Sequence, residues 1–192
     1  LPSRLRIDVQ TSQEPGTAPP SETAALHALE ESVALDPDVP VDIDLRAVGV
    51  LGVAGEQTER DALLRWLVLQ TAILHSPREV GIVALVPESA LDAWQWVHWL
   101  PHTETLVSGL PDARTVAARP DEVRALFGAI DDLITSRRIQ AERRPGSNDD
   151  GYTPTVFVVI PGDIAVPRPA LARVLADGPA FGVVAVVGAP SV

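Results

Sequence analysis

The 192-residue sequence contains no cysteine and no methionine, and only 4% of its residues are aromatic. The lack of cysteine excludes structural disulfides and thiolate metal sites, which suits a reducing compartment. Basic residues are also scarce, because 15 lysines and arginines stand against 26 aspartates and glutamates, for a formal net charge of -11. A chain of this charge repels polyanions unless a local basic face compensates, so nonspecific nucleic-acid binding is disfavoured.

Long apolar runs are missing as well. No stretch of the sequence approaches the roughly 20 apolar residues of a membrane-spanning helix. The N-terminus "LPSRLRIDVQ" lacks the apolar region of a signal peptide and does not begin with methionine. We therefore expect a fragment of a larger protein, in which a membrane anchor lies outside this segment.

The sequence does have enough apolar content for a folded core, because 46% of its residues are hydrophobic and 21% are charged. Residues 1–20 combine a short alternating strand pattern with a linker rich in Pro, Gly, Ser and Thr. Ser21 then caps a predicted amphipathic helix over residues 21–35. We therefore divide the chain into an N-terminal strand and linker, 1–20, and one domain, 21–192.

Predicted strands and helices alternate along that domain. We expect strands at 39–45, 47–53, 80–86, 104–108, 154–160 and 182–188, and helices at 58–75, 88–100, 120–144 and 168–178. The long helix at 120–144 carries an apolar stripe made of Val123, Leu126, Phe127, Ile130, Leu133 and Ile134. Alternation of this kind predicts βαβ crossovers, and hence an α/β fold with a mainly parallel sheet wrapped by helices.

The segment "GVAGEQTERDALLRW", residues 52–66, follows an apolar run and has the glycines and helix of a phosphate-binding loop. Aligned with G-x-x-x-x-G-K-[ST] from Gly52, it places Gln57 at the second glycine, Thr58 at the lysine and Glu59 at the magnesium ligand. Gly55 is the other glycine of the turn. Glu56 and Glu59 put negative charge where a helix N-terminus would attract phosphate, so we predict a turn that does not bind nucleotide.

The partner strand of a nucleotide site normally ends in an acidic residue that orients magnesium or the attacking water. Here the strand "TVFVVI" is followed by Pro161, and Asp163 comes two residues later. Either Asp163 substitutes in a divergent ATPase, or it is an ordinary loop acid. We favour the second interpretation, because both halves of the nucleotide machinery are then missing together.

The stretch beginning "GVLGVAGEQTERDALLRW" and the later "WQWVHWLPH" resemble ATPases of the FtsK/SpoIIIE superfamily in actinobacteria, including EccC of type VII secretion. The resemblance is to the degenerate nucleotide-binding-like domain between the membrane segments and the first standard ATPase domain. It covers roughly residues 39–188, and Pro161 departs from it where the family has an acid. The matching residues are Gly52, Gly55, Arg65, Gln70, His75, Ser76, Pro77, Trp94, Trp96, Trp99, Leu100, Pro101 and His102.

This resemblance implies a three-layer, P-loop NTPase-like core of RecA type. It also implies a parent protein at the cytoplasmic face of the cell membrane, with membrane-embedded secretion or translocation components and other domains of the same chain as partners. The parent would be a homo-oligomer, a hexamer in this family. No cofactor is expected in this segment, whereas ATP and magnesium are expected in the parent's other domains.

The element "WQWVHWLPH" holds three of the four tryptophans in the sequence. Its helix is apolar almost all round, so it is either enclosed or leaves an indole exposed as an interface anchor. On the second interpretation Trp94, Trp96, Trp99 and His102 form a partner interface. The four-residue spacing of His98 and His102 is not read as a metal site, because no nearby carboxylate completes a ligand set.

A cluster of arginines closes the helix at 120–144, namely Arg137, Arg138, Arg143 and Arg144. A helix C-terminus favours cations, so a solvated basic face is the simpler interpretation. The alternative is a contact with a neighbouring subunit or with acidic lipid headgroups. No arrangement of Ser, His and Asp points to nucleophilic catalysis, so no catalytic residue is assigned.

Overall fold

The computed structural model describes residues 43–104, 115–143 and 152–190. From Asp44 onward these residues belong to one compact unit. The predicted strand near the N-terminus, the helix at 21–35 and the boundary at residue 20 lie outside the described residues. No helix among the described residues is long and apolar enough to cross a membrane.

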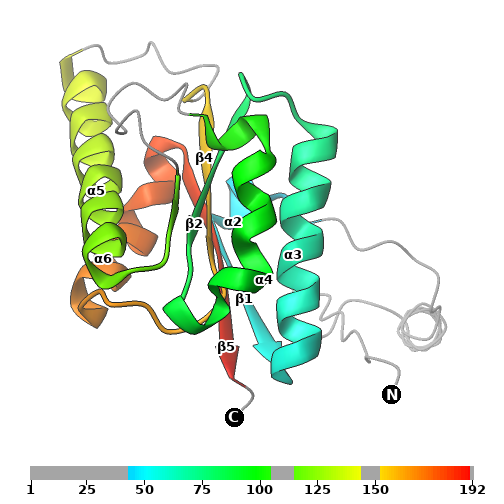
Figure 1. Cartoon of the computed structure of the whole chain (residues 1–192). Helices are drawn as coiled ribbons and strands as arrows, with labels where there is room; N and C mark the ends of the chain where they lie inside the picture. The colour runs from blue at the N-terminus through cyan, green and yellow to red at the C-terminus, as the bar shows by residue number, and fades with distance from the viewer. Residues whose placement is uncertain (1–42, 105–114, 144–151, 191–192) are drawn as a thin grey trace, which may run out of the picture. The chain divides into compact units, whose positions relative to one another are not determined.

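Five parallel strands form one sheet at the centre of this unit (Figure 1). They are β1 (Val50–Gly55), β2 (Val80–Leu85), β3 (Val116–Ala117), β4 (Thr155–Ile160) and β5 (Val183–Pro190). Their spatial order is β1-β5-β4-β2-β3, so β1 and the short β3 are the edges. The prediction of an α/β fold with a parallel sheet is confirmed.

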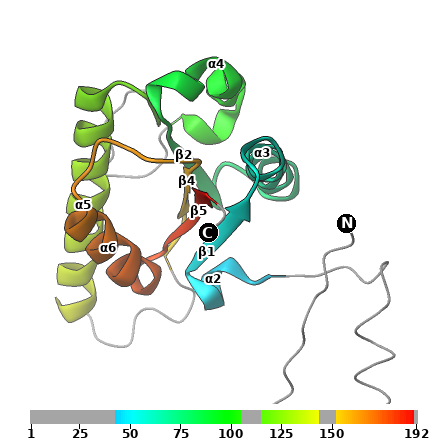
Figure 2. The same ribbon diagram turned by 90° about the horizontal axis from the view of Figure 1, so that it is seen from below.

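Helices cover both faces of the sheet and make three layers. They are α2 (Leu45–Val48), α3 (Gln57–Leu74), α4 (Leu91–Trp94), α5 (Pro120–Arg143) and α6 (Arg168–Asp177). Figure 2, which looks from below, shows α3 and α4 on one face and α5 and α6 on the other. Single turns of 3-10 helix lie at η1 (Glu88–Ala90), η2 (Gln95–Trp99), η3 (Pro101–Thr103) and η4 (Gly178–Phe181).

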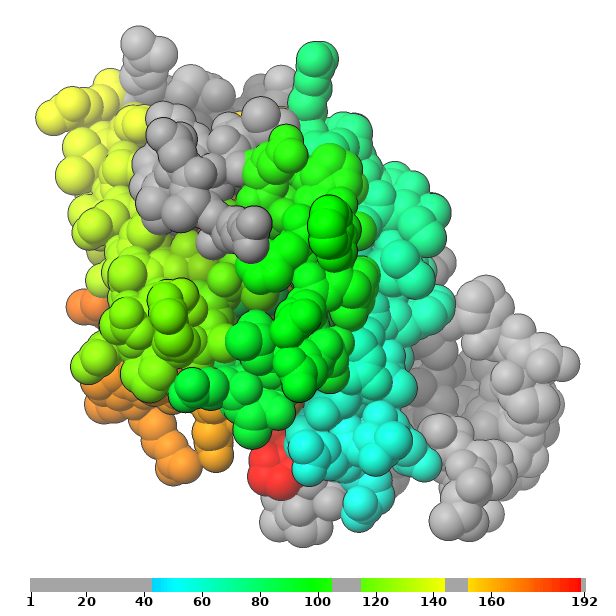
Figure 3. All heavy atoms as spheres, in the orientation of Figure 1, coloured from blue at the N-terminus to red at the C-terminus, as the bar shows by residue number. Residues whose placement is uncertain are grey.

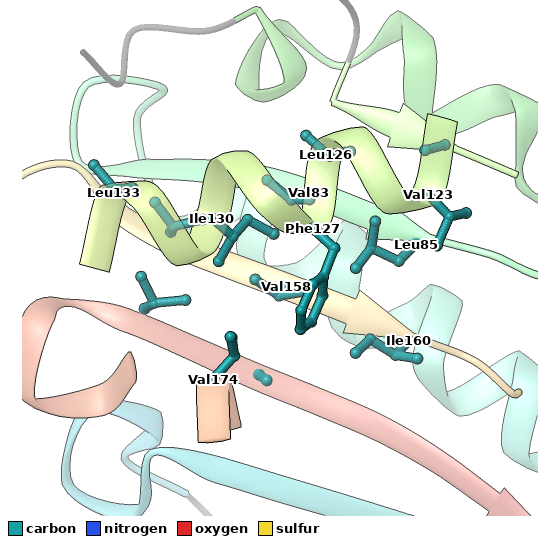
Figure 4. Close-up of a cluster of buried hydrophobic side chains, with 14 of the residues drawn as sticks. Val83, Leu85, Val123, Leu126, Phe127, Ile130, Leu133, Val158, Ile160 and Val174 are labelled. Atoms are coloured by element: carbon teal, nitrogen blue, oxygen red, sulfur yellow. The ribbon is translucent and has the colours of Figure 1, made fainter. Parts of the chain in front are cut away.

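The core beneath α5 is the stripe predicted from the sequence. All six of its apolar residues are buried against β2, β4, β5 and α6. Figure 4 shows Phe127 and Ile130 of α5 pointing down onto the strands, where Val158 and Ile160 of β4 meet them. Since every side chain of β4 is buried, that strand is covered on both faces, as a continuous apolar run predicts.

The two strands predicted at 39–45 and 47–53 are wrong in part. Leu45–Val48 is a short helix, and β1 begins only at Val50. The helix forms because the Asp44 carboxylate accepts hydrogen bonds from the backbone N–H groups of Arg46 and Ala47, at 2.9 and 3.3 Å. Residues 39–42 of the first predicted strand lie outside the described part of the chain.

The helix predicted at 88–100 is broken into η1, α4 and η2. Trp94 and Val97 both reach the core, and their three-residue spacing fits the three residues per turn of a 3-10 helix. Most of the strand predicted at 104–108 lies outside the described residues. The strand that continues the sheet beyond β2 is instead β3, which the sequence analysis missed.

Candidate functional site

The turn between β1 and α3 occupies the place of a phosphate-binding loop, but it is a single residue long. β1 continues to Gly55 and α3 starts at Gln57, so Glu56 alone connects them. Gly52 lies inside the strand, paired with Val187 of β5, and not in a loop. A phosphate cradle is built from several successive N–H groups that converge on one point, whereas here a single residue separates the strand from the helix.

The side chains of this turn project into solvent. Thr58 and Glu59 lie in the exposed first turn of α3. Glu56 is the N-cap residue, yet its carboxylate accepts no hydrogen bond from that turn. The two acids therefore contribute negative charge near the helix N-terminus, without filling it as an internal ligand would. Gly55 has a φ of 157°, which residues other than glycine rarely adopt. The sharp turn therefore requires glycine at this position.

At the end of β4 the structure places a proline against the neighbouring strand. Pro161 is buried, and its carbonyl oxygen would lie only 2.6 Å from a Cβ atom added to Gly188 of β5. Asp163 is exposed beyond this proline and outside the strand. Pro161 thus follows the carboxyl end of β4, the position at which a nucleotide site carries its acidic residue.

Two cavities stand out in the described part of the chain, and neither lies at the turn after β1. One is a space of about 10 Å³ inside the α5 core, and the other, of about 190 Å³, is lined by Arg46, Tyr152, Pro179 and Gly182 among others. Within the described residues, no three side chains of His, Asp or Glu are grouped to hold a metal.

The tryptophan element splits between core and surface. Trp94 is fully buried, and Trp96 is half-buried against the same core. Trp99 is 88% exposed. Of the four residues predicted to form a partner interface, therefore, Trp99 presents most of its side chain to solvent, while Trp94 and His102 lie inside the domain.

His102 joins two segments that the family resemblance singled out separately. Its Nε2 atom lies 2.8 Å from the carbonyl oxygen of His75, at the end of α3. Because a carbonyl oxygen only accepts, Nε2 is the donor of this hydrogen bond. This bond ties the tryptophan element to the end of α3.

Arg137 was grouped with the surface arginines by sequence, and this grouping is wrong. Its side chain is buried, and its guanidinium donates to the carbonyl oxygens of Phe181 at 2.7 Å and Pro154 at 3.0 Å. It also lies 5.0 Å from the ring centre of Tyr152. Burial lowers the pKa of this guanidinium. The only signal in the sequence was its position on the buried stripe of α5, seven residues after Ile130.

Gly182 is part of the same cluster. It has a φ of 69°, and a Cβ atom there would lie 2.6 Å from Cβ of Tyr152. The cluster thus holds the start of β5 at the end of the sheet opposite the turn after β1. The role of this cluster is structural, because the Arg137 guanidinium donates its hydrogen bonds to backbone carbonyl oxygens.

Comparisons with known proteins find relatives in secretion systems. The chain is 31% identical over 132 residues to the ESX-3 secretion system protein EccC3 of Mycobacterium tuberculosis. That match covers 68% of this chain and 10% of the relative. A second relative, the ESX-4 secretion system protein EccC4 of the same species, is 36% identical over 87 residues, which are 45% of this chain and 7% of the relative. No protein-family model matches the chain.

Solved structures agree on the fold. The cytoplasmic domain of the type VII secretion ATPase EccC from Thermomonospora curvata superposes with a TM-score of 0.57 and 22% identity, over 78% of this chain and 19% of that one. ATPases 2 and 3 of the same EccC, in complex with a signal sequence peptide, give a TM-score of 0.52 and 17% identity, over 81% and 28%. The chain therefore spans a small part of each relative's length.

Proposed function

Most of this chain is homologous to an ATPase domain of the EccC proteins of type VII secretion, and we propose that it is a catalytically silent coupling and assembly domain. In this role it keeps the three-layer fold of an ATPase domain. It couples and assembles other parts of a larger translocase of the FtsK/SpoIIIE or EccC type. It does not bind or hydrolyse ATP itself.

One observation carries the proposal: the connection between β1 and α3 consists of Glu56 alone. Thr58 in place of the lysine and Glu59 in place of the magnesium ligand remove only the side chains that would bind phosphate and magnesium. A one-residue turn also removes the loop whose backbone N–H groups would surround the phosphates. Pro161 at the end of β4 supports the same conclusion, since it takes the place of the acidic residue.

We also propose a wider setting for this domain, which its similarity to the EccC proteins supports. The parent protein would stand at the cytoplasmic face of the cell membrane, held by segments outside this chain. The partners of this domain would be other domains of the same chain, further copies in a hexamer, and membrane-embedded secretion components. ATP and magnesium would act in other domains of the parent, and the acidic charge of this chain disfavours nucleic acid as its partner.

Titration calorimetry with MgATP tests the silent-domain proposal, and no binding is expected. A triple variant, Gln57→Gly with Thr58→Lys and Glu59→Ser, restores the motif letters without lengthening the turn, so it also stays inactive. Micromolar binding by the wild-type chain that is lost in Thr58→Ala would overturn the proposal. Recovery of binding in the triple variant would show that side chains, not turn length, remove the site.

The alternative function is a divergent ATPase that uses Asp163 and an arginine from another subunit. It requires turnover that rises with protein concentration and disappears in Asp163→Ala. The exposed position of Asp163, beyond Pro161 and outside β4, gives it no fixed place in a catalytic site.

A second candidate function, protein docking through the tryptophan element, is favoured by the exposure of Trp99. Trp99→Ala would then abolish capture of parent-complex proteins in pull-down experiments. Capture that is unchanged in Trp99→Ala would count against it. Trp94→Ala is not a suitable probe, because that side chain is buried and its loss would disturb the fold.

A further inference from the structure

We draw no further inference here: the strongest candidate, the exposed apolar side of α3 that carries Trp66, Leu69 and Ile73 (α3 is cyan to teal in Figure 3), is an unpartnered helix face, and nothing in the structure shows what covers it.

Discussion

The two long helices of the domain, α5 and α3, use their apolar residues differently. α5 has 24 residues and buries seven of them, including Phe127 and Arg137. α3 has 18 residues and buries only Leu64 and Val68, while Leu63, Trp66, Leu69, Ile73 and Leu74 stay exposed. The two helices lie on opposite faces of the same sheet (Figure 2).

The comparison teaches that apolar content alone does not tell core from interface. In α5 most large apolar residues form one buried stripe, and the exposed residues are mostly polar, apart from Ile139. In α3 apolar residues surround the helix, and the sheet covers only part of them. The uncovered part includes Trp66, Leu69 and Ile73, and it therefore stabilises the fold less than the buried side does.

The largest expected effect separates the two helices directly. Phe127→Ala removes a buried ring from the α5 core and should lower the free energy of unfolding by about 4 kcal/mol. Trp66→Ala deletes a larger side chain, but it should change the free energy of unfolding by less than about 0.5 kcal/mol, because Trp66 is 55% exposed. Urea denaturation measures both. Similar losses in the two variants would contradict the contrast between the helices.

Two neighbouring residues of α3 sharpen the contrast within one helix. Leu64 is fully buried and Leu63 is 44% exposed. Leu64→Ala should cost about 3 kcal/mol in unfolding free energy, because it leaves a cavity beneath the helix. Leu63→Ala should cost only a few tenths. If both variants unfold at the same urea concentration, α3 does not have a buried and a free side.

The third prediction concerns two adjacent arginines of α5. Arg137→Met leaves the carbonyl oxygens of Phe181 and Pro154 without their donor and should cost about 2 kcal/mol. Arg138 is exposed and pairs with Asp177 at 2.7 Å, so Arg138→Met should cost no more than about 0.5 kcal/mol. Thermal unfolding of the two variants side by side checks this. Equal shifts would mean that Arg137 is a surface residue after all.

The smallest effect lies just after α3. The Glu79 carboxylate accepts a hydrogen bond from the backbone N–H of Ser76 at 2.9 Å, and this bond holds the pKa of Glu79 below its ordinary value of 4.5. A lowered pKa in the folded state means that the contribution to stability is present above pH 4.5 and is lost as the pH falls through the folded pKa. Wild type and Glu79→Gln should therefore differ slightly at neutral pH and converge in acid. Thermal unfolding of the two proteins, at neutral pH and in acid, measures this difference in stability. A difference that grows in acid would contradict the role given to the hydrogen bond between Glu79 and Ser76.

Much of the fold was predictable because it depends on local patterns. The apolar runs at β2, β4 and β5, the ends of α3 within one residue, and the buried stripe of α5 all appear in the sequence as periodicity and as end signals. The prediction failed at α2, where a strand was expected. The side chain of Asp44 caps the N-terminus of this short helix and stabilises it. It also failed at 88–100, where the continuous helix is replaced by short helical segments. There Trp94 and Val97 are both buried, and their three-residue spacing fits the three residues per turn of a 3-10 helix.

The residue types at the candidate site could be read from the sequence, but the length of the turn and the contacts between distant residues could not. In the sequence, Thr58, Glu59 and Pro161 stand at the positions where the phosphate-loop pattern and its partner strand have lysine, a magnesium ligand and an acid. Only the structure shows that β1 extends through Gly52 to Gly55, because the length of a strand depends on its pairing with β5, far away in the chain. The same is true of His102, whose bond to His75 spans 27 residues.

The sequence by itself determined the class of fold and the main core helix, since both depend on residue identity and on spacing within one element. Tertiary structure decided the one-residue turn, the structural role of Arg137 and the exposure of Trp66, Leu69 and Ile73. The physical reason is that periodicity shows which residues share a face of a helix. Whether that face is covered depends on elements distant in the chain, and in α3 the sheet covers only one of two apolar sides.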